Sequence, residues 1–247
     1  MQQYPHDSIK PYSEAETKKQ QVSNMFDEIA PKYDFMNRFL SAGIDIIWRR
    51  KAIKRFRNRP VSTLLDVATG TGDMAIMAAR ILQPDKITGI DISEGMLELG
   101  KKKIENQHLE TKIDLIKGDA ETINFTDNTF DGVMVAYGVR NFENLDKGLK
   151  EIFRVLNPGG LLVVLEFSKP VIPGIRNFYN FYMGTVAPFF CKLFSQNKKA
   201  YQYLNKSAKA FPDRELFVDI LNKNGFSDTT CKPLSLGICC IYTGLKK

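Results

Sequence analysis

Residues 64–73 read Leu-Leu-Asp-Val-Ala-Thr-Gly-Thr-Gly-Asp. An apolar run that ends in a glycine-rich turn is typical of a buried strand followed by a tight loop and a helix. The helical pattern after the loop continues to Leu82. Strands at 86–90, 112–117, 130–136 and 161–167 alternate with helices at 93–106 and 145–156. This alternation predicts βαβ units, and therefore an α/β fold with a mostly parallel sheet and helices on both faces.

Both ends of the chain depart from that alternation. Residues 1–20 form a polar tail, and residues 21–60 read as a helical extension broken at Pro31 and Gly43. Residues 61–247 form the main domain, within which 175–203 is rich in aromatic side chains. Residues 228–245 read as two strands joined near Leu236, which predicts a hairpin and hence an antiparallel C-terminal strand.

The net charge of +7 over 247 residues comes from one stretch. Residues 49–59 hold seven cations and no acid, so the rest of the chain is neutral overall. Nucleic acid, an anionic membrane surface or a solvated helix face could each explain such a run. The ordinary hydrophobic and charged fractions, 43% and 26%, exclude disordered and collagen-like classes.

Cysteine and histidine usage limits the chemistry. The four cysteines show no C-x-x-C spacing and the chain has two histidines, so we expect no metal site and no histidine base. The first residues contain no apolar secretory segment, and charged residues interrupt the stretch 175–194. A cytoplasmic protein without a membrane span is therefore the expectation.

The glycine loop has two readings. Residues 70–75 fit the pattern G-x-G-x-x-A, and Asp91 follows at the distance of a ribose-binding acid, as in dinucleotide-binding folds. However, carboxylates surround the loop. Asp66, Asp91 and Asp119 lie at the ends of predicted strands, and Asp73 lies at the start of the helix after the loop. An acidic crevice would repel a pyrophosphate and favour a ligand with a cationic centre, hydroxyls and an amine. S-adenosylmethionine has all three features, and its carboxylate could use the helix N-terminus after the loop.

Further motifs narrow this choice. Together with residues 66–73, Gly118-Asp119-Ala120 and the turn 156–160 resemble class I methyltransferases with a Rossmann-like sheet. Residues 32–37, 47–50, 138–141 and 165–170 are similar to the family that C-methylates the ring of demethylmenaquinone and of a ubiquinone precursor. Ala68 replaces the usual first glycine of the loop, as it also does in that family.

The resemblance implies S-adenosylmethionine as cofactor and a polyprenyl hydroquinone as substrate. It assigns cofactor binding to Asp66, Gly70, Thr71, Asp91, Asp119, Ala120 and Ala136. Asp91 would accept hydrogen bonds from the ribose, and Asp119 or the Ala120 amide would bind adenine. Some relatives carry serine at the position of Ala136, where alanine offers only its backbone.

The implied reaction displaces the sulfonium methyl group with a ring carbon made nucleophilic by loss of a phenolic proton. The catalytic candidates are Arg140 and Asn141. Since an arginine stays protonated, we expect Arg140 to stabilise the phenolate while water or a carboxylate takes the proton. The alternative is a structural arginine paired with Asp127 or Glu143.

The resemblance also assigns residues 21–60 to a lid over the cofactor, with Tyr33 and Asn37 as candidate substrate or lid contacts. The aromatic segment 175–203 would hold the prenyl tail, or else form a helical core pair. A lipid-embedded substrate implies a transient, peripheral contact at the inner face of the membrane, with 49–59 as one candidate surface. A homodimer is left open.

Three rival functions remain: a methyltransferase of another small molecule or lipid, an RNA methyltransferase, and a non-catalytic cofactor-binding regulator. The basic run 49–59 motivates the RNA reading. The chain shows no added RNA-binding module, so no nucleic-acid partner is expected.

Overall fold

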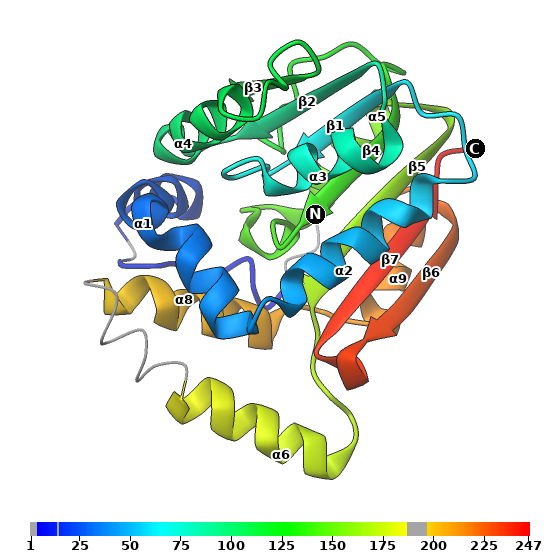
Figure 1. Cartoon of the computed structure of the whole chain (residues 1–247). Helices are drawn as coiled ribbons and strands as arrows, with labels where there is room; N and C mark the ends of the chain where they lie inside the picture. The colour runs from blue at the N-terminus through cyan, green and yellow to red at the C-terminus, as the bar shows by residue number, and fades with distance from the viewer. Residues whose placement is uncertain (1–3, 14, 187–196) are drawn as a thin grey trace.

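A seven-stranded sheet forms the centre of the computed structural model, which describes residues 4–13, 15–186 and 197–247 (Figure 1). The strand order is β3-β2-β1-β4-β5-β7-β6. The strands are β1 (Thr63–Val67), β2 (Lys86–Asp91), β3 (Ile113–Lys117), β4 (Phe130–Ala136), β5 (Leu156–Phe167), β6 (Ser227–Leu234) and β7 (Cys239–Leu245). Strands β1 to β5 pair in parallel, whereas β7 is antiparallel to both β5 and β6. The predicted fold class is confirmed.

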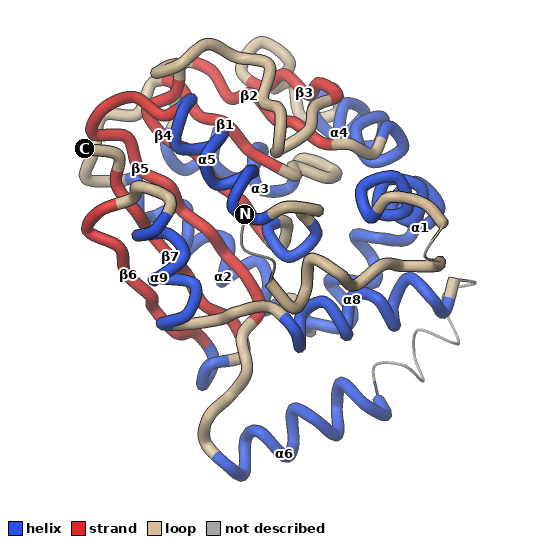
Figure 2. Tube along the Cα trace, turned by 180° about the vertical axis from the view of Figure 1, so that it is seen from behind, coloured by secondary structure: helices blue, strands red, loops and turns tan. Residues whose placement is uncertain are grey.

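Helices cover both faces of the sheet, as predicted. On one face α2 (Ile44–Ile53), α3 (Asp73–Leu82) and α4 (Glu94–Glu105) bury side chains against the strands. On the other face α5 (Leu145–Val155) and α9 (Glu215–Lys223) build a second apolar core. Short 3-10 helices lie at η1 (Lys54–Phe56), η2 (Val139–Asn141) and η4 (Ser235–Gly237). Figure 2 shows the same layers from behind.

Local sequence signals explain where several elements begin. The Ser93 hydroxyl caps α4 by accepting from the Met96 amide, and the Asn144 side chain caps α5 in the same way at Lys147. Strand β5 begins at Leu156 and thus includes the stretch expected to be a turn. Leu156 pairs with Phe130 ahead of a register shift, and Gly159 takes up a φ of +79° there.

Helix α1 (Lys18–Ser41) corrects one prediction, because Pro31 lies inside the helix and does not break it. A proline there loses one hydrogen bond. Tertiary packing offsets the loss, since Met25 and Ile29 are buried against Met96 of α4 and Tyr203 of α8 (Lys198–Ala210). The predicted break at Gly43 is confirmed, with a φ of +76° between α1 and α2.

The N-terminal segment differs from the expected polar tail. Tyr4 and His6 are buried, and the Tyr4 hydroxyl donates to Asp146 at 2.8 Å. The buried ammonium of Lys18 donates to three carbonyl oxygens, those of His6, Arg140 and Phe142. These bonds satisfy all three donors of a lysine, which explains how a charged side chain is accommodated there. The segment is thereby tied to the loop that carries Arg140.

The aromatic-rich segment begins as α6 (Pro173–Phe181) and the π-helical turn η3 (Tyr182–Val186), and it resumes as α8 (Lys198–Ala210). Figures 1 and 2 show α6 at the periphery, beyond α8. Three of the aromatic residues expected to form a tail pocket, Phe189, Phe190 and Phe194, lie outside the described residues. Within the described part of the chain, no helix combines the length and apolar character needed to cross a membrane.

Candidate active site

The glycine loop at the carboxyl edge of the sheet is held by Asp91. One oxygen of this carboxylate accepts from the Gly70 amide at 2.8 Å and the other from the Ser93 amide at 2.9 Å. Ala68, Gly70 and Gly72 all have positive φ values, 54°, 58° and 77°. These conformations turn the chain sharply between β1 and α3. The loop backbone is thus fixed against the end of β2.

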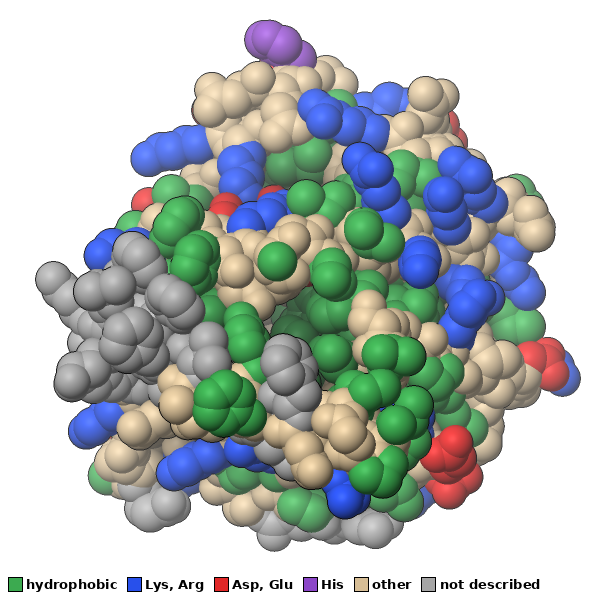
Figure 3. Space-filling view, turned by 60° about the horizontal axis from the view of Figure 1, so that its bottom comes forward, with side chains coloured by type: hydrophobic (Ala, Val, Ile, Leu, Met, Phe, Trp, Pro, Cys, Tyr) green, Lys and Arg blue, Asp and Glu red, His purple; other side chains and the backbone are tan. Residues whose placement is uncertain are grey.

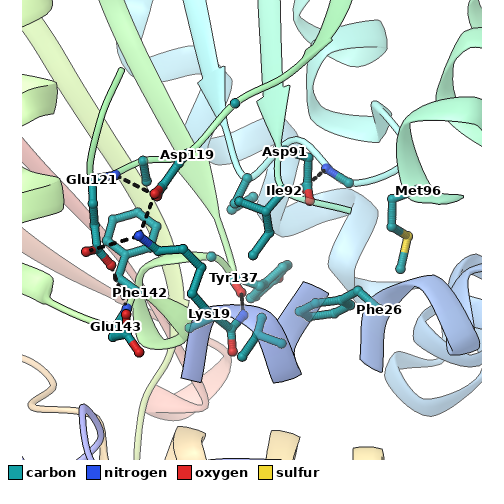
Figure 4. Close-up of a pocket in the computed structure, with 18 of the residues that line it drawn as sticks. Lys19, Phe26, Asp91, Ile92, Met96, Asp119, Glu121, Tyr137, Phe142 and Glu143 are labelled. Atoms are coloured by element: carbon teal, nitrogen blue, oxygen red, sulfur yellow. Dashed lines mark hydrogen bonds and ion pairs between the residues drawn. The ribbon is translucent and has the colours of Figure 1, made fainter. Parts of the chain in front are cut away.

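A cavity of about 70 Å³ lies beside this loop (Figure 4). Seven predicted site residues line it: Tyr33, Gly70, Asp91, Asp119, Ala120, Ala136 and Asn141. Two acids that were not predicted to face the cofactor, Glu121 and Glu143, complete an acidic wall. The position of Glu121, two residues after Asp119 at a strand end, was the signal that could have found it. The cavity is therefore acidic, as predicted, with a partly different set of carboxylates.

The chemical groups that line this cavity fit S-adenosylmethionine. A Cβ added to Gly70 would meet no atom within 4 Å, so the loop backbone is open to a ligand. Ile92, Met96 and Phe26 provide apolar walls, and the carboxylates suit a cationic ligand that also carries hydroxyls and an amine. These residues can hold the cofactor as one set.

Asp66 and Thr71 do not line either cavity described here, which differs from their expected direct contact with the cofactor. The fully buried Asp66 carboxylate accepts from the Thr69 hydroxyl at 2.7 Å, and burial raises its pKa to about 7. The Thr71 hydroxyl bonds to Asp34 and to the Lys103 ammonium. Both side chains are thus engaged by groups of the protein itself.

Asp73 also lies away from the acidic cavity wall. Its carboxylate pairs with Lys103 at 2.7 Å and with Arg38 at 2.9 Å. The four carboxylates expected to rim one crevice are thus split into two groups. Asp91 and Asp119 face the cavity, whereas Asp66 and Asp73 are bound within the protein.

Lys19 of α1 crosses the mouth of the acidic cavity, as Figure 4 shows. Its ammonium lies 2.5 Å from Asp119 and 3.5 Å from Glu121. The contact joins the first turn of α1 to the loop after β3. An ion pair thus links the start of α1 to the acidic cavity wall.

A second and larger cavity, of about 870 Å³, meets the first at Tyr33 and Tyr137, which line both. Asn37 and Arg140 line the larger cavity. Most of its wall is apolar or aromatic and comes from α1, α2, α6, η3 and α8: Leu40, Ile44, Trp48, Ile175, Tyr179, Tyr182 and Leu204. The site thus joins a small acidic compartment to a large apolar one.

Arg140 is buried at the inner part of the larger cavity. Its Nη1 lies 2.6 Å from Oε1 of Glu166 and 2.8 Å from the Tyr137 carbonyl oxygen. The alternative pairing with Asp127 or Glu143 is wrong, since Asp127 binds Arg154 and Glu143 accepts from the Lys18 amide. The Arg140 Nε has no hydrogen-bond partner among the described residues. A cation with spare donors therefore faces the apolar compartment.

The other predicted residues lie around Arg140. The Asn141 amide oxygen accepts from the Tyr203 hydroxyl at 3.2 Å, which joins η2 to α8. Burial raises the pKa of Tyr33, and a hydrogen bond with Asn37 opposes that rise. Tyr33 therefore stays neutral and can donate or accept a hydrogen bond where the two compartments meet.

The sheet is mostly parallel, and its antiparallel strand β7 lies beside β5. Together with the acidic cavity beside the glycine loop, this topology defines a class I SAM-dependent methyltransferase. The crystal structure of a SAM-dependent methyltransferase from Thermotoga maritima has a TM-score of 0.64 to this fold. It covers 92% of this chain and 100% of its own at 20% identity, and so shows the fold alone. The chain belongs to the ubiE/COQ5 methyltransferase family, which it matches over residues 14–246.

Two relatives are similar over nearly their whole length. The demethylmenaquinone methyltransferase of Bacteroides fragilis is 45% identical over 98% of this chain and 99% of its own. The ubiquinone/menaquinone biosynthesis C-methyltransferase UbiE of Geotalea daltonii is 44% identical, over 93% of this chain and 97% of its own. The family and cofactor expected from the sequence are confirmed.

Proposed function

We propose that this chain transfers the methyl group of S-adenosylmethionine to a ring carbon of a reduced polyprenyl quinone precursor, with demethylmenaquinol as the preferred substrate. As a member of its family, the chain is a methyltransferase. The names of its relatives support a role in quinone biosynthesis. The observation that carries the proposal is the pair of cavities joined at Tyr33 and Tyr137, one acidic and one apolar.

When bound, S-adenosylmethionine supplies an electrophilic methyl group on a positively charged sulfur. The acidic wall of Asp91, Asp119, Glu121 and Glu143 suits that charge. Asp91 keeps free lone pairs for hydroxyl groups, although two backbone amides already bind it. Ala120 and Ala136 line the same cavity and present only methyl groups to a ligand.

Arg140 provides the electrostatic part of the reaction. A cation in an apolar compartment stabilises a developing phenolate far more than it would in water. The phenolate directs electron density to the ortho ring carbon, which attacks the methyl group. Glu166 is fully buried and lines neither cavity, so it positions Arg140 and leaves the proton to water or to a carboxylate at the cavity wall.

The larger cavity suits the prenyl chain of the substrate. Its volume of about 870 Å³ and its aromatic wall suit an apolar tail that continues outward between α2, α6 and α8. Tyr182 of η3 donates to the Leu40 carbonyl of α1 at 2.7 Å, which holds the two sides of the cavity together. This arrangement favours the tail pocket over a simple helical core pair.

A lipid-embedded tail requires the cavity mouth to approach a membrane. Figure 3 shows hydrophobic side chains gathered around a hollow, with lysine and arginine side chains along one side. Exposed apolar residues on the elements that form the cavity are Phe35, Phe39, Ile44, Ile47, Val171, Ile172, Phe181 and Leu236. Arg50, Lys51 and Lys54 of the basic run are exposed beside them. We assign this surface to a transient contact with anionic lipid at the cytoplasmic face of the membrane. A homodimer, the other predicted partner, stays a prediction.

The experiment is incubation with labelled S-adenosylmethionine and one of two short-chain substrates, demethylmenaquinol or the demethylated ubiquinol precursor. We expect transfer to demethylmenaquinol, with less to the ubiquinol precursor. RNA is the control substrate, because an RNA methyltransferase is one of the rival functions. Transfer to neither quinol contradicts the proposal, and salt-sensitive transfer to RNA would replace it.

A further inference from the structure

Arg49 does not belong to the charged surface on which the sequence placed it. It opens the basic run 49–59, yet it is 7% exposed and lines the larger cavity. Its neighbour Arg50 is exposed, because the two side chains leave α2 in different directions. The structure therefore removes one cation from the proposed membrane surface and adds it to the substrate compartment.

Arg49 forms an ion pair with Asp45 but makes no hydrogen bond to it. Its Nε lies 3.6 Å from Oδ2 of Asp45, beyond hydrogen-bond distance. Both oxygens of Asp45 are in use: one pairs with Arg38 and the other accepts from Ser41 at 2.8 Å. Among the described residues, the buried Nε of Arg49 has no hydrogen-bond partner. A buried donor without a hydrogen-bond acceptor is costly, so an oxygen of a ligand that the Arg49 guanidinium can reach would be favoured.

Arg49 and Arg140 belong to one cluster around a pair of stacked rings. The centroids of Tyr137 and Phe167 are 4.7 Å apart. The guanidinium carbon of Arg49 lies 5.2 Å from the Tyr137 centroid, and that of Arg140 lies 5.4 Å from the Phe167 centroid. Both arginines line the larger cavity where Tyr137 joins it to the acidic one. The apolar compartment thus has two separate cationic positions at its inner end.

We infer that Arg49 binds the second oxygen of a 1,4-dihydroxy aromatic ring, the oxygen para to the one that Arg140 stabilises. The inference rests on the proposed function. A guanidinium can only donate hydrogen bonds, and a ring hydroxyl or carbonyl oxygen can accept them. Two arginines at two para oxygens fix the axis of the ring, and the prenyl chain in the larger cavity fixes its rotation about that axis. Together they decide which ring carbon faces the methyl donor.

The role of Arg49 differs from that of Arg140. The oxygen beside the reacting carbon carries the developing charge, whereas the para oxygen serves mainly as a point of attachment. Loss of Arg49 should therefore weaken ring binding, with KM affected more than kcat. Loss of Arg140 should affect kcat more than KM.

The test measures equilibrium binding, in the presence of S-adenosylhomocysteine, of two short-chain ring compounds under reducing conditions. One is demethylmenaquinol. The other is an analogue that keeps the hydroxyl next to the carbon to be methylated and lacks only the second hydroxyl, which is para to the first. We expect the unsubstituted enzyme to bind the diol about tenfold or more tightly than the analogue, as for a hydrogen bond to a charged donor. In Arg49→Met the two affinities should become equal.

Arg80→Met is the matched control, since Arg80 is exposed on α3 and lines neither cavity. It should keep the preference of the unsubstituted enzyme. Arg49→Lys, which retains a donor and a charge, should recover part of it. Equal affinities in the unsubstituted enzyme overturn the inference whether or not Arg49→Met folds, and so does an unchanged preference in Arg49→Met. Failure to bind either ring compound, with S-adenosylhomocysteine still bound, overturns the proposed function itself.

Discussion

Nη1 of Arg140 and Oε1 of Glu166 lie 2.6 Å apart, and neither side chain is more than 4% exposed. Arg140 comes from η2 and Glu166 from β5, so the pair joins the loop after β4 to the neighbouring strand. A buried pair of this kind is held by the geometry around it, and removing one partner leaves the other charge uncompensated. The pair therefore fixes where the Arg140 cation lies at the wall of the larger cavity.

Glu166→Gln should lower kcat without changing cofactor affinity, because Arg140 loses its anchor while the acidic cavity is untouched. We expect a loss of about tenfold to a hundredfold, since misplacement of a catalytic group has costs of this size. Steady-state kinetics and calorimetric binding of S-adenosylmethionine measure the two effects. Glu110→Gln, at an exposed position, is the control. Unchanged turnover in Glu166→Gln would show that the pair is not needed.

Arg140→Ala should lose about a hundredfold or more of turnover, since it removes the cation that stabilises the phenolate. Cofactor affinity should stay within about twofold, because Arg140 lines only the larger cavity. Arg140→Lys should recover part of the activity, although an ammonium has fewer donors than a guanidinium. A fully active Arg140→Ala would remove this residue from the mechanism.

Lys19→Met should speed both association and dissociation of the cofactor by several-fold. The Lys19–Asp119 contact must break whenever the cavity opens, and its side chains are 32% and 23% exposed, so the tie is weak and sensitive to salt. Stopped-flow fluorescence measures both rates. Lys32→Met, on an exposed position of the same helix, serves as control. Rates equal to those of the unsubstituted enzyme would show that Lys19 does not hold the lid.

The stability of the protein should depend on pH through Asp66. Burial raises the folded-state pKa of this carboxyl from 3.8 to about 7, so its contribution is fully present below pH 4 and is lost as pH rises through 7. Asp66→Asn cannot ionise. The free energy of unfolding of the variant, minus that of the original protein, should rise between pH 4 and 8 by on the order of 4 kcal/mol. Urea unfolding at several pH values measures this difference, and a flat difference contradicts it.

Binding to lipid vesicles should increase with the fraction of anionic lipid. Replacing Arg50, Lys51 and Lys54 together with glutamine should weaken binding to anionic vesicles about tenfold or more, as each cation near the surface contributes about 1 kcal/mol. A triple change at the exposed residues Arg80, Lys86 and Lys102 is the control. Co-sedimentation that does not depend on the fraction of anionic lipid would indicate that the basic run 49–59 is a solvated helix face.

The fold could be predicted because its signals are local. The apolar runs, the Ser93 cap and the break at Gly43 each act over a few residues, and the structure has all of them. Pro31 is the exception, since the packing of α1 against α4 and α8 outweighs a local breaking signal. The positions of Asp91 and Asp119 beside the acidic cavity could be predicted for the same reason.

Side-chain direction and long-range pairing could not be predicted in this way. The sequence does not tell which of Arg49 and Arg50 points inward, because that depends on how α2 lies on the sheet. The pairing of Arg140 with Glu166 joins residues 26 positions apart, and Lys18 reaches carbonyls more than 120 positions away. Such contacts follow from the tertiary arrangement alone.

The central claim, methyl transfer to a ring carbon of a reduced quinol, is tested most directly by locating the transferred group. The enzyme is supplied with ¹³C-methyl S-adenosylmethionine and short-chain demethylmenaquinol, and the product is examined by nuclear magnetic resonance. The account predicts a single labelled methyl on the ring carbon beside the prenyl-bearing carbon, with both hydroxyls retained, and no product from the oxidised quinone. A label on oxygen, or equal transfer to the oxidised quinone, would contradict it.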